Sequence, residues 1–146
     1  MNDIKKYKNL IESADEEEIY ISNDHAEIEG YVTNTYSERV VNWFTNRHKI
    51  NPEKTIDYIK ENFERISFLN NMNIFDDEDR GKGYGKEIME QFIDEAYDNG
   101  AEIIILYADL QESQEEGFDL VKFYEKYGFD VIERYTDGVL MVLEEG

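Results

Sequence analysis

The stretch RGKGYG at residues 80–85 decides the fold, because it stands between an apolar run of strand type and an amphipathic helical stretch. The first turn of a helix leaves several backbone N–H groups unpaired, and the helix dipole adds partial positive charge there. Glycine has no Cβ, so a ligand can approach its backbone closely. Arg80, Lys82 and Lys86 add three cations within seven residues of a chain whose net charge is −20. We therefore predict that this turn is a cradle for a pyrophosphate group.

Composition indicates one globular domain over residues 1–146, since 40% of the residues are hydrophobic and 14% are aromatic. The chain has no cysteine, which excludes disulfides and cysteine nucleophiles and agrees with a cytoplasmic location. No apolar run approaches the roughly 18 residues of a membrane span, so we expect no membrane partner.

The charge balance is strongly acidic, with 35 Asp and Glu residues against 15 Lys and Arg residues. Binding of nucleic acid through its phosphates needs clustered basic side chains, so a direct nucleic-acid partner is not expected. An acidic surface favours a cationic partner, such as an amine or a basic protein. The alternative is that the acidity only keeps the chain soluble.

Hydrophobic periodicity predicts an alternation of strands and helices along the chain. Helices are expected at residues 3–13, 51–62, 83–98 and 118–127. Strands are expected at residues 18–22, 26–33, 65–75 and 103–107, and in a hairpin over residues 130–135 and 139–143. Residues 36–49 fit a helix and a strand equally well. This order predicts a mixed α+β fold with helices packed on the faces of a sheet.

The strand at residues 65–75 shows an alternation of apolar side chains. Ile66, Phe68, Met72 and Ile74 share one parity, while Leu69 and Phe75 share the other. Two common nucleotide-binding loops do not fit the turn that follows, because neither the Walker A spacing nor the dinucleotide spacing of glycines is present. The pattern [RQ]-x-x-G-x-[GA] does fit, and Arg80, Gly83 and Gly85 satisfy it.

This pattern, together with FYEKYGF at residues 123–129, resembles the GNAT superfamily of acyl-CoA-dependent N-acetyltransferases. The resemblance covers roughly residues 65–146. It implies a mostly antiparallel mixed sheet that splays apart between two parallel strands ending near Phe75 and Tyr107. It also implies acetyl-CoA as cosubstrate and no metal. The cosubstrate would contact the backbone of two segments, which consist of Asn73, Ile74 and Phe75, and of Arg80, Gly81, Lys82, Gly83, Tyr84, Gly85 and Lys86.

The implied reaction is direct transfer of an acetyl group to an amine. Tyr124 stands where many members of the superfamily carry the acid that protonates the departing thiolate, although a helix tyrosine can equally serve packing. The general base stays open. The strand at residues 65–75 offers only Ser and Asn, and the alternatives are Asp109, His25, His48 or a chain of waters.

Two acidic runs border the predicted site, of which the first fits a solvated turn best and the second suggests that the acceptor is a cationic small amine or a basic protein. The first is Asp76–Asp79, and the second contains Glu112, Glu115 and Glu116. Trp43 and Phe44 either line the acceptor pocket or fill the core. The alternative function is an acidic interaction or inhibitor protein on the same scaffold, which binds or modifies a basic partner. We expect a monomer or a homodimer.

Overall fold

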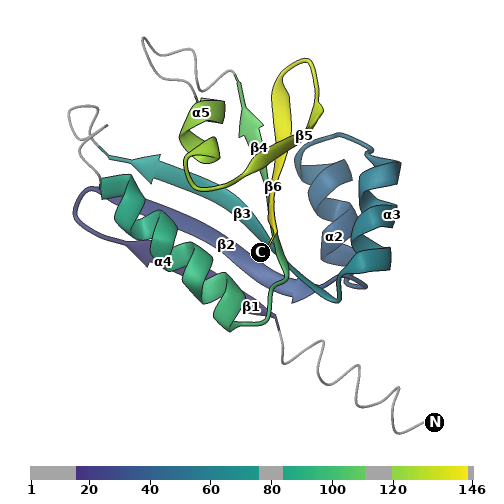
Figure 1. Cartoon of the computed structure of the whole chain (residues 1–146), viewed down its shortest axis with the longest axis horizontal. Helices are drawn as coiled ribbons and strands as arrows, with labels where there is room; N and C mark the ends of the chain where they lie inside the picture. The colour runs from purple at the N-terminus through teal and green to yellow at the C-terminus, as the bar shows by residue number, and fades with distance from the viewer. Residues whose placement is uncertain (1–15, 76–83, 111–119, 145–146) are drawn as a thin grey trace, which may run out of the picture.

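The computed structural model describes residues 16–75, 84–110 and 120–144, and these residues contain a six-stranded mixed sheet (Figure 1). The strand order is β1-β2-β3-β4-β6-β5. β3 and β4 run parallel, and the other neighbouring pairs are antiparallel. The strands are β1 (Glu17–Ser22), β2 (Ala26–Asn34), β3 (Arg65–Ile74), β4 (Ile103–Asp109), β5 (Asp130–Arg134) and β6 (Gly138–Glu144). The predicted α+β class and the C-terminal hairpin are confirmed.

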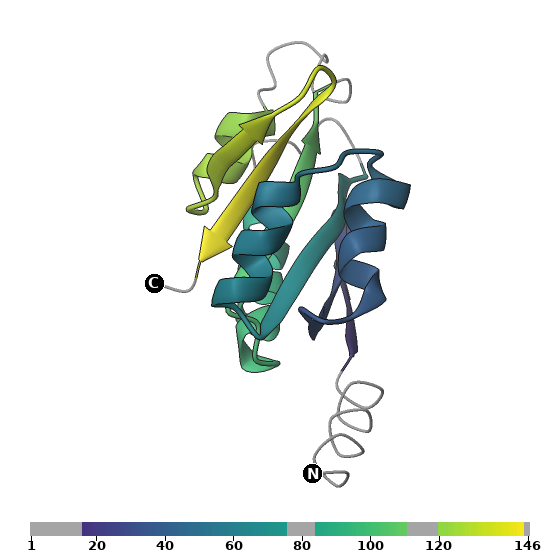
Figure 2. The ribbon, with the colours of Figure 1, turned by 90° about the vertical axis from the view of Figure 1, so that its right-hand side faces the viewer.

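Helices cover both faces of this sheet (Figures 1 and 2). One face carries α2 (Glu38–Asn42), the π-helix η1 (Trp43–Arg47) and α3 (Glu53–Asn62), and the other carries α4 (Tyr84–Asp98) and α5 (Leu120–Glu125). The sheet thus separates two hydrophobic cores, which we call the α2/α3 core and the α4/α5 core. The helix expected at residues 3–13 lies outside the described residues. Among the described helices, none is long and apolar enough to cross a membrane.

Within the ambiguous segment at residues 36–49, residues 38–47 are helical. The Ser37 side chain accepts a hydrogen bond from the backbone N–H of Arg39, which is the usual way to begin a helix. The helix then widens into η1, and this places Trp43 and Phe44 in the α2/α3 core. The periodicity was ambiguous because Val40, Trp43 and Phe44 are residues that strands also favour.

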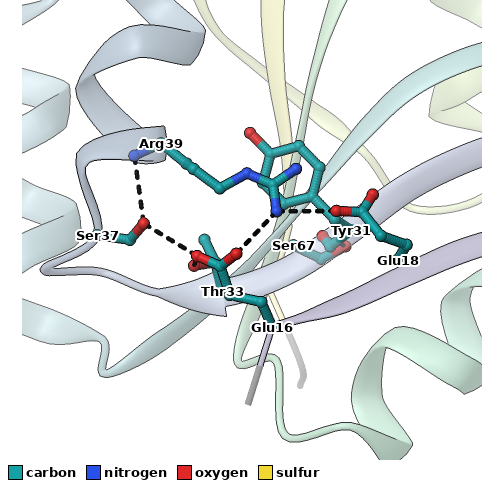
Figure 3. Close-up of polar contacts among 7 residues, drawn as sticks. All are labelled: Glu16, Glu18, Tyr31, Thr33, Ser37, Arg39 and Ser67. Atoms are coloured by element: carbon teal, nitrogen blue, oxygen red, sulfur yellow. Dashed lines mark hydrogen bonds and ion pairs between the residues drawn. The ribbon is translucent and has the colours of Figure 1, made fainter. Parts of the chain in front are cut away.

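Polar contacts hold the start of α2 against the sheet (Figure 3). Nη1 of Arg39 donates to carboxylate oxygens of Glu16 at 3.1 Å and Glu18 at 2.9 Å, and its guanidinium lies 3.5 Å from the centre of the Tyr31 ring. The Ser37 hydroxyl also donates to Glu16. Because α2 is fixed in this way, η1 is held in place over the middle of the sheet.

A β-bulge interrupts the pairing of β2 with β3. Glu29 pairs with Asn71 and the next residue, Gly30, pairs with Leu69, so Asn70 is the extra residue on β3. One extra residue exchanges the two faces of a strand from that point onward. The expectation that Ile66, Phe68, Met72 and Ile74 share one face is therefore wrong. The first two belong to the α2/α3 core, whereas Met72 and Ile74 pack against the α4/α5 core with Leu69.

The parallel strands separate at the bulge, directly after Leu69. β3 and β4 pair only between Ile66–Leu69 and Ile103–Leu106. Beyond these residues, β3 continues against β2, and β4 continues against β6. The splay expected between the strands ending near Phe75 and Tyr107 is confirmed, and it opens the sheet at its centre.

Candidate active site

A pocket of about 580 Å³ lies where β3 and β4 separate. Its walls come from β3 and β4, from α5, and from the outer strands β1 and β2. No strand pairing closes the sheet beyond Leu69 and Leu106, so the pocket is reached by side chains from both faces. Its lining includes Asn70, Met72, Ile74, Tyr107, Asp109 and Tyr124.

The main chain of β3 presents alternate residues to this opening. The N–H of Phe75 donates to the carbonyl of His25 at 2.9 Å, so it is not available to a cosubstrate. In an antiparallel ladder, residues that bond the partner strand alternate with residues whose main-chain groups point away. It follows that Asn73 bonds β2, while Ile74 and Met72 point their main-chain groups toward β4. The contacts of Asn73, Ile74 and Phe75 with a cosubstrate stay a prediction, and in the structure it is Ile74 of these three, together with Met72, whose main-chain groups face the opening.

The predicted pyrophosphate turn is described only in part. The described residues do not include Arg80, Gly81, Lys82 or Gly83. The backbone of Tyr84 begins α4. Lys86 is exposed, with Nζ 3.9 Å from a carboxylate oxygen of Glu90 one turn along the helix. In this turn Lys86 is exposed, whereas Gly85 is buried.

Gly85 lets the first turn of α4 pack closely against the pocket wall. A Cβ at this position would lie 2.7 Å from Cε of Met72, 3.4 Å from Cδ1 of Ile74 and 3.6 Å from Cζ of Phe123. The last two residues come from β3 and α5, so α4 begins where both of these elements border the opening. A pyrophosphate held at this helix start would lie at the α4/α5 end of the pocket.

Tyr124 lies on α5, and it both packs in the core and lines the pocket. Its side chain is only 8% exposed, and its ring meets those of Phe123 and Phe129 at centroid distances of 5.4 and 6.0 Å. The helix ends at Glu125, and the turn that follows it ends at Gly128, whose φ of 100° is unfavourable for residues with a Cβ. The FYEKYGF stretch thus forms a helix end that fixes Tyr124 at the opening. Tyr124 can therefore pack in the core and line the pocket at the same time.

A cluster of aromatic side chains lies behind the pocket on the α2/α3 face. The indole N–H of Trp43 donates to Oδ1 of Asn70 at 2.7 Å, and the His48 ring lies 4.4 Å from that of Trp43 and 4.7 Å from that of Tyr107. Burial, followed by the positive charge of Arg47, lowers the pKa of His48 to about 4. Its Nε2 is buried without a hydrogen-bond partner among the described residues. His48 is therefore neutral near pH 7.

The outer strands contribute carboxylates that the sequence reasoning missed. Glu27 accepts a 2.7 Å hydrogen bond from the Tyr20 hydroxyl, and Glu29 accepts one of the same length from Asn71. These residues line the pocket although they lie far from both sequence motifs. Polar residues alternate with apolar ones at positions 27 and 29, and this was the sequence signal for the two carboxylates. The same alternation is equally typical of a strand with one solvent-exposed face, so it does not indicate a pocket.

The three side chains considered as general base lie at different positions relative to the pocket. Asp109 lines the pocket, His48 lies behind it, and His25 is in the turn between β1 and β2, outside the pocket lining. The acidic runs at residues 76–79 and 112–116 lie outside the described residues. Among the described residues, no group of His, Asp and Glu is arranged to hold a metal ion.

Fold and pocket together define an α+β protein with a binding site between two parallel strands that separate. Residues 54–129, just over half of the chain, match the model of the Acetyltransferase (GNAT) family. The chain belongs to this family. The fold of the chain is therefore that of the GNAT acetyltransferases.

Solved structures share the fold at low sequence identity. An acetyltransferase from Bacillus cereus is 12% identical with a TM-score of 0.54, and the match covers 99% of this chain and 87% of that one. The polyamine N-acetyltransferase of Drosophila melanogaster is 12% identical with a TM-score of 0.55, over 83% and 69% of the two chains. The Arabidopsis thaliana protein NAA60, crystallised with acetyl-CoA, is 10% identical with a TM-score of 0.53, over 82% and 64%.

A curated relative is similar over a shorter stretch. A putative ankyrin repeat protein from Rickettsia bellii is 30% identical over 86 residues, which cover 49% of this chain. The chain spans only 12% of that protein's length.

Proposed function

We propose that the protein transfers an acetyl group from acetyl-CoA directly to the primary amine of a cationic acceptor, which is a small amine or a basic protein. The observation that carries this proposal is the pocket between β3 and β4, because the separated strand edges and the Tyr124 side chain line it and the start of α4 packs against its wall. Family membership and a neighbour crystallised with acetyl-CoA support the donor.

The residues at the opening suit the parts of the donor. The main-chain groups of Met72 and Ile74 that face β4 provide hydrogen bonds for an amide-bearing arm lying between the strands. The first turn of α4, with Gly85 and Lys86, provides N–H groups and positive charge for a pyrophosphate. The predicted contribution of Arg80–Gly83 completes this binding region.

Tyr124 is the group proposed to protonate the departing thiolate. Its side chain is held by Phe123 and Phe129, and it lines the pocket beside the exposed edge of β3. A phenol in this position donates a proton to sulfur as the bond from the carbonyl carbon to sulfur breaks. The amine must lose a proton before it attacks, so a second group or water is needed on the acceptor side.

The charges around the pocket favour a cationic acceptor. Glu27, Glu29 and Asp109 line it, and the chain as a whole carries a net charge of −20. A negative field of this kind raises the local concentration of ammonium groups. The polyamine N-acetyltransferase of Drosophila melanogaster, which shares the fold, supports the same acceptor class.

Calorimetry with acetyl-CoA and assays of thiol release test the proposal. We expect saturable binding of acetyl-CoA, and thiol release on addition of spermidine, agmatine or a lysine-rich peptide. Binding without thiol release would contradict catalysis on such acceptors. Absence of binding would overturn the proposal and leave the acidic interaction protein as the alternative.

A further inference from the structure

Two polar side chains enter the pocket from opposite faces of the sheet. Along β4, Ile103 and Ile105 belong to the α2/α3 core, and Tyr107 packs against the same core. The register of β4 with β6 continues without a shift from Ile103 to Asp109, so the alternation holds and Asp109 lies on the α2/α3 face. Tyr124 belongs to the α4/α5 core. Both residues nevertheless line one pocket.

We propose that the carboxylate of Asp109 is the general base that accepts the proton of the acceptor's ammonium group. This inference rests on the proposed function. A donor anchored at the start of α4 occupies the α4/α5 side of the opening, so the amine arrives from the α2/α3 face, where Asp109 lies. The acid and the base then stand on opposite sides of the reacting carbonyl.

The proton and electron balance of this step is complete. The ammonium gives one proton to the Asp109 carboxylate, and the amine nitrogen that results uses its electron pair to bond the thioester carbon. The carbon–sulfur bond breaks, and the thiolate takes the phenolic proton of Tyr124. The second proton lost by the nitrogen restores that phenol, and Asp109 returns its proton to solvent. The products are the amide, the thiol and one proton.

The other titratable groups around the pocket are placed less well for this role. Glu27 and Glu29 lie on β2, which β3 separates from β4. They are suited to attract a cationic acceptor rather than to take the proton of the attacking nitrogen.

His48 is neutral but has no open path to the acceptor, because its Nε2 is buried and its ring lies against Trp43 and Tyr107. Asp109 and Arg47 are both close enough to act on the charge of His48, in opposite directions. On the remaining side, the Tyr107 hydroxyl donates to Asp137 at 2.8 Å. Asp109 is therefore the carboxylate that β4 itself brings to the separated strand ends.

The test compares Asp109→Asn with Asp57→Asn, which makes the same change in net charge on the exposed surface of α3. Each variant is assayed for thiol release with spermidine, agmatine and a lysine-rich peptide, and for acetyl-CoA affinity by calorimetry. We expect Asp109→Asn to lower kcat/KM at pH 7 by about 100-fold or more, with unchanged acetyl-CoA affinity. Asp57→Asn should match the wild type in both measurements.

The pH profile and a conservative variant separate catalysis from a structural effect. Without its base, Asp109→Asn should gain activity about tenfold per pH unit above neutrality, because free amine then forms in solution. Asp109→Glu should recover part of the loss. Asp109→Asn turnover within threefold of wild type, a wild-type pH profile, or a loss of acetyl-CoA binding would overturn the assignment. Failure of the wild type itself to bind acetyl-CoA would instead overturn the proposed function.

Discussion

The indole N–H of Trp43 donates a 2.7 Å hydrogen bond to Oδ1 of Asn70, the residue that forms the bulge in β3. This bond connects η1 on the α2/α3 face with the point at which β3 leaves β4. The ring of Trp43 also stacks on Phe68 at a centroid distance of 4.4 Å. The bulge is therefore fixed from one side by packing and by a polar contact.

Replacing Trp43 with Phe tests how much this contact contributes. The variant keeps an aromatic ring over Phe68 but leaves the Asn70 amide oxygen without its donor. We expect the free energy of unfolding to fall by about 1–2 kcal/mol, measured by urea denaturation. In a double-mutant cycle with Asn70→Ala, a coupling energy near zero would show that the bond does not matter.

Tyr124→Phe removes the phenolic proton and keeps the packing of the ring. We expect kcat to fall about 100-fold with unchanged acetyl-CoA affinity, because the hydroxyl acts only as the thiolate departs. Tyr127→Phe is the matched control, since Tyr127 packs against Phe123 on the same helix end and should keep wild-type kcat. Equal activity of the two variants would refute the role of Tyr124.

Gly128→Ala places a Cβ on a residue with φ of 100°, and that Cβ would lie 3.0 Å from Cδ1 of Leu143. We expect the protein to lose about 1–2 kcal/mol of stability in thermal unfolding. Gly128→Asn should lose less, because asparagine tolerates left-handed backbone better than alanine. The reverse order of the two variants would contradict backbone strain as the cause.

His48 should make stability depend on pH. Its folded pKa of about 4 lies below the value near 6.5 of an unfolded histidine, so the unfolded chain binds more protons between these pH values. This contribution is complete above pH 6.5 and is lost as the pH falls to 4. The contribution of His48 to the free energy of unfolding amounts to about 1–2 kcal/mol, because solvent that reaches the partly exposed ring screens part of the effect.

His48→Phe is the variant that isolates this effect, because it retains a ring between Trp43 and Tyr107. Denaturation series at pH 7, 5.5 and 4 should show a smaller fall in stability for the variant than for the wild type. Parallel curves would mean that the histidine has no part in the acid sensitivity, which the many carboxylates also share.

The sequence was sufficient for the elements around the two motifs. Hydrophobic periodicity predicted helices at residues 83–98 and 118–127, which correspond to α4 and α5, because an apolar stripe at helical spacing is a local signal. The face of Met72 and Ile74 was not predictable by alternation, since the bulge at Asn70 depends on pairing with a strand about forty residues earlier.

The carboxylates that β2 contributes to the pocket were also beyond sequence reasoning. Glu27, Glu29 and Tyr20 come from β1 and β2, and only the assembly of the sheet brings them to the same pocket as Asp109 and Tyr124. Trp43 lay in the ambiguous segment, where packing on Phe68 rather than local preference decides for a helix.

The short ladder between β3 and β4 has a mechanical consequence. Four residue pairs join the half of the sheet made of β1, β2 and β3 to the half made of β4, β5 and β6. A molecule that bonds both separated edges would supply the cross-connections that the backbone lacks there. Occupancy by the donor would then slow the parting of the two halves and protect their amides from exchange, as well as raising the melting temperature.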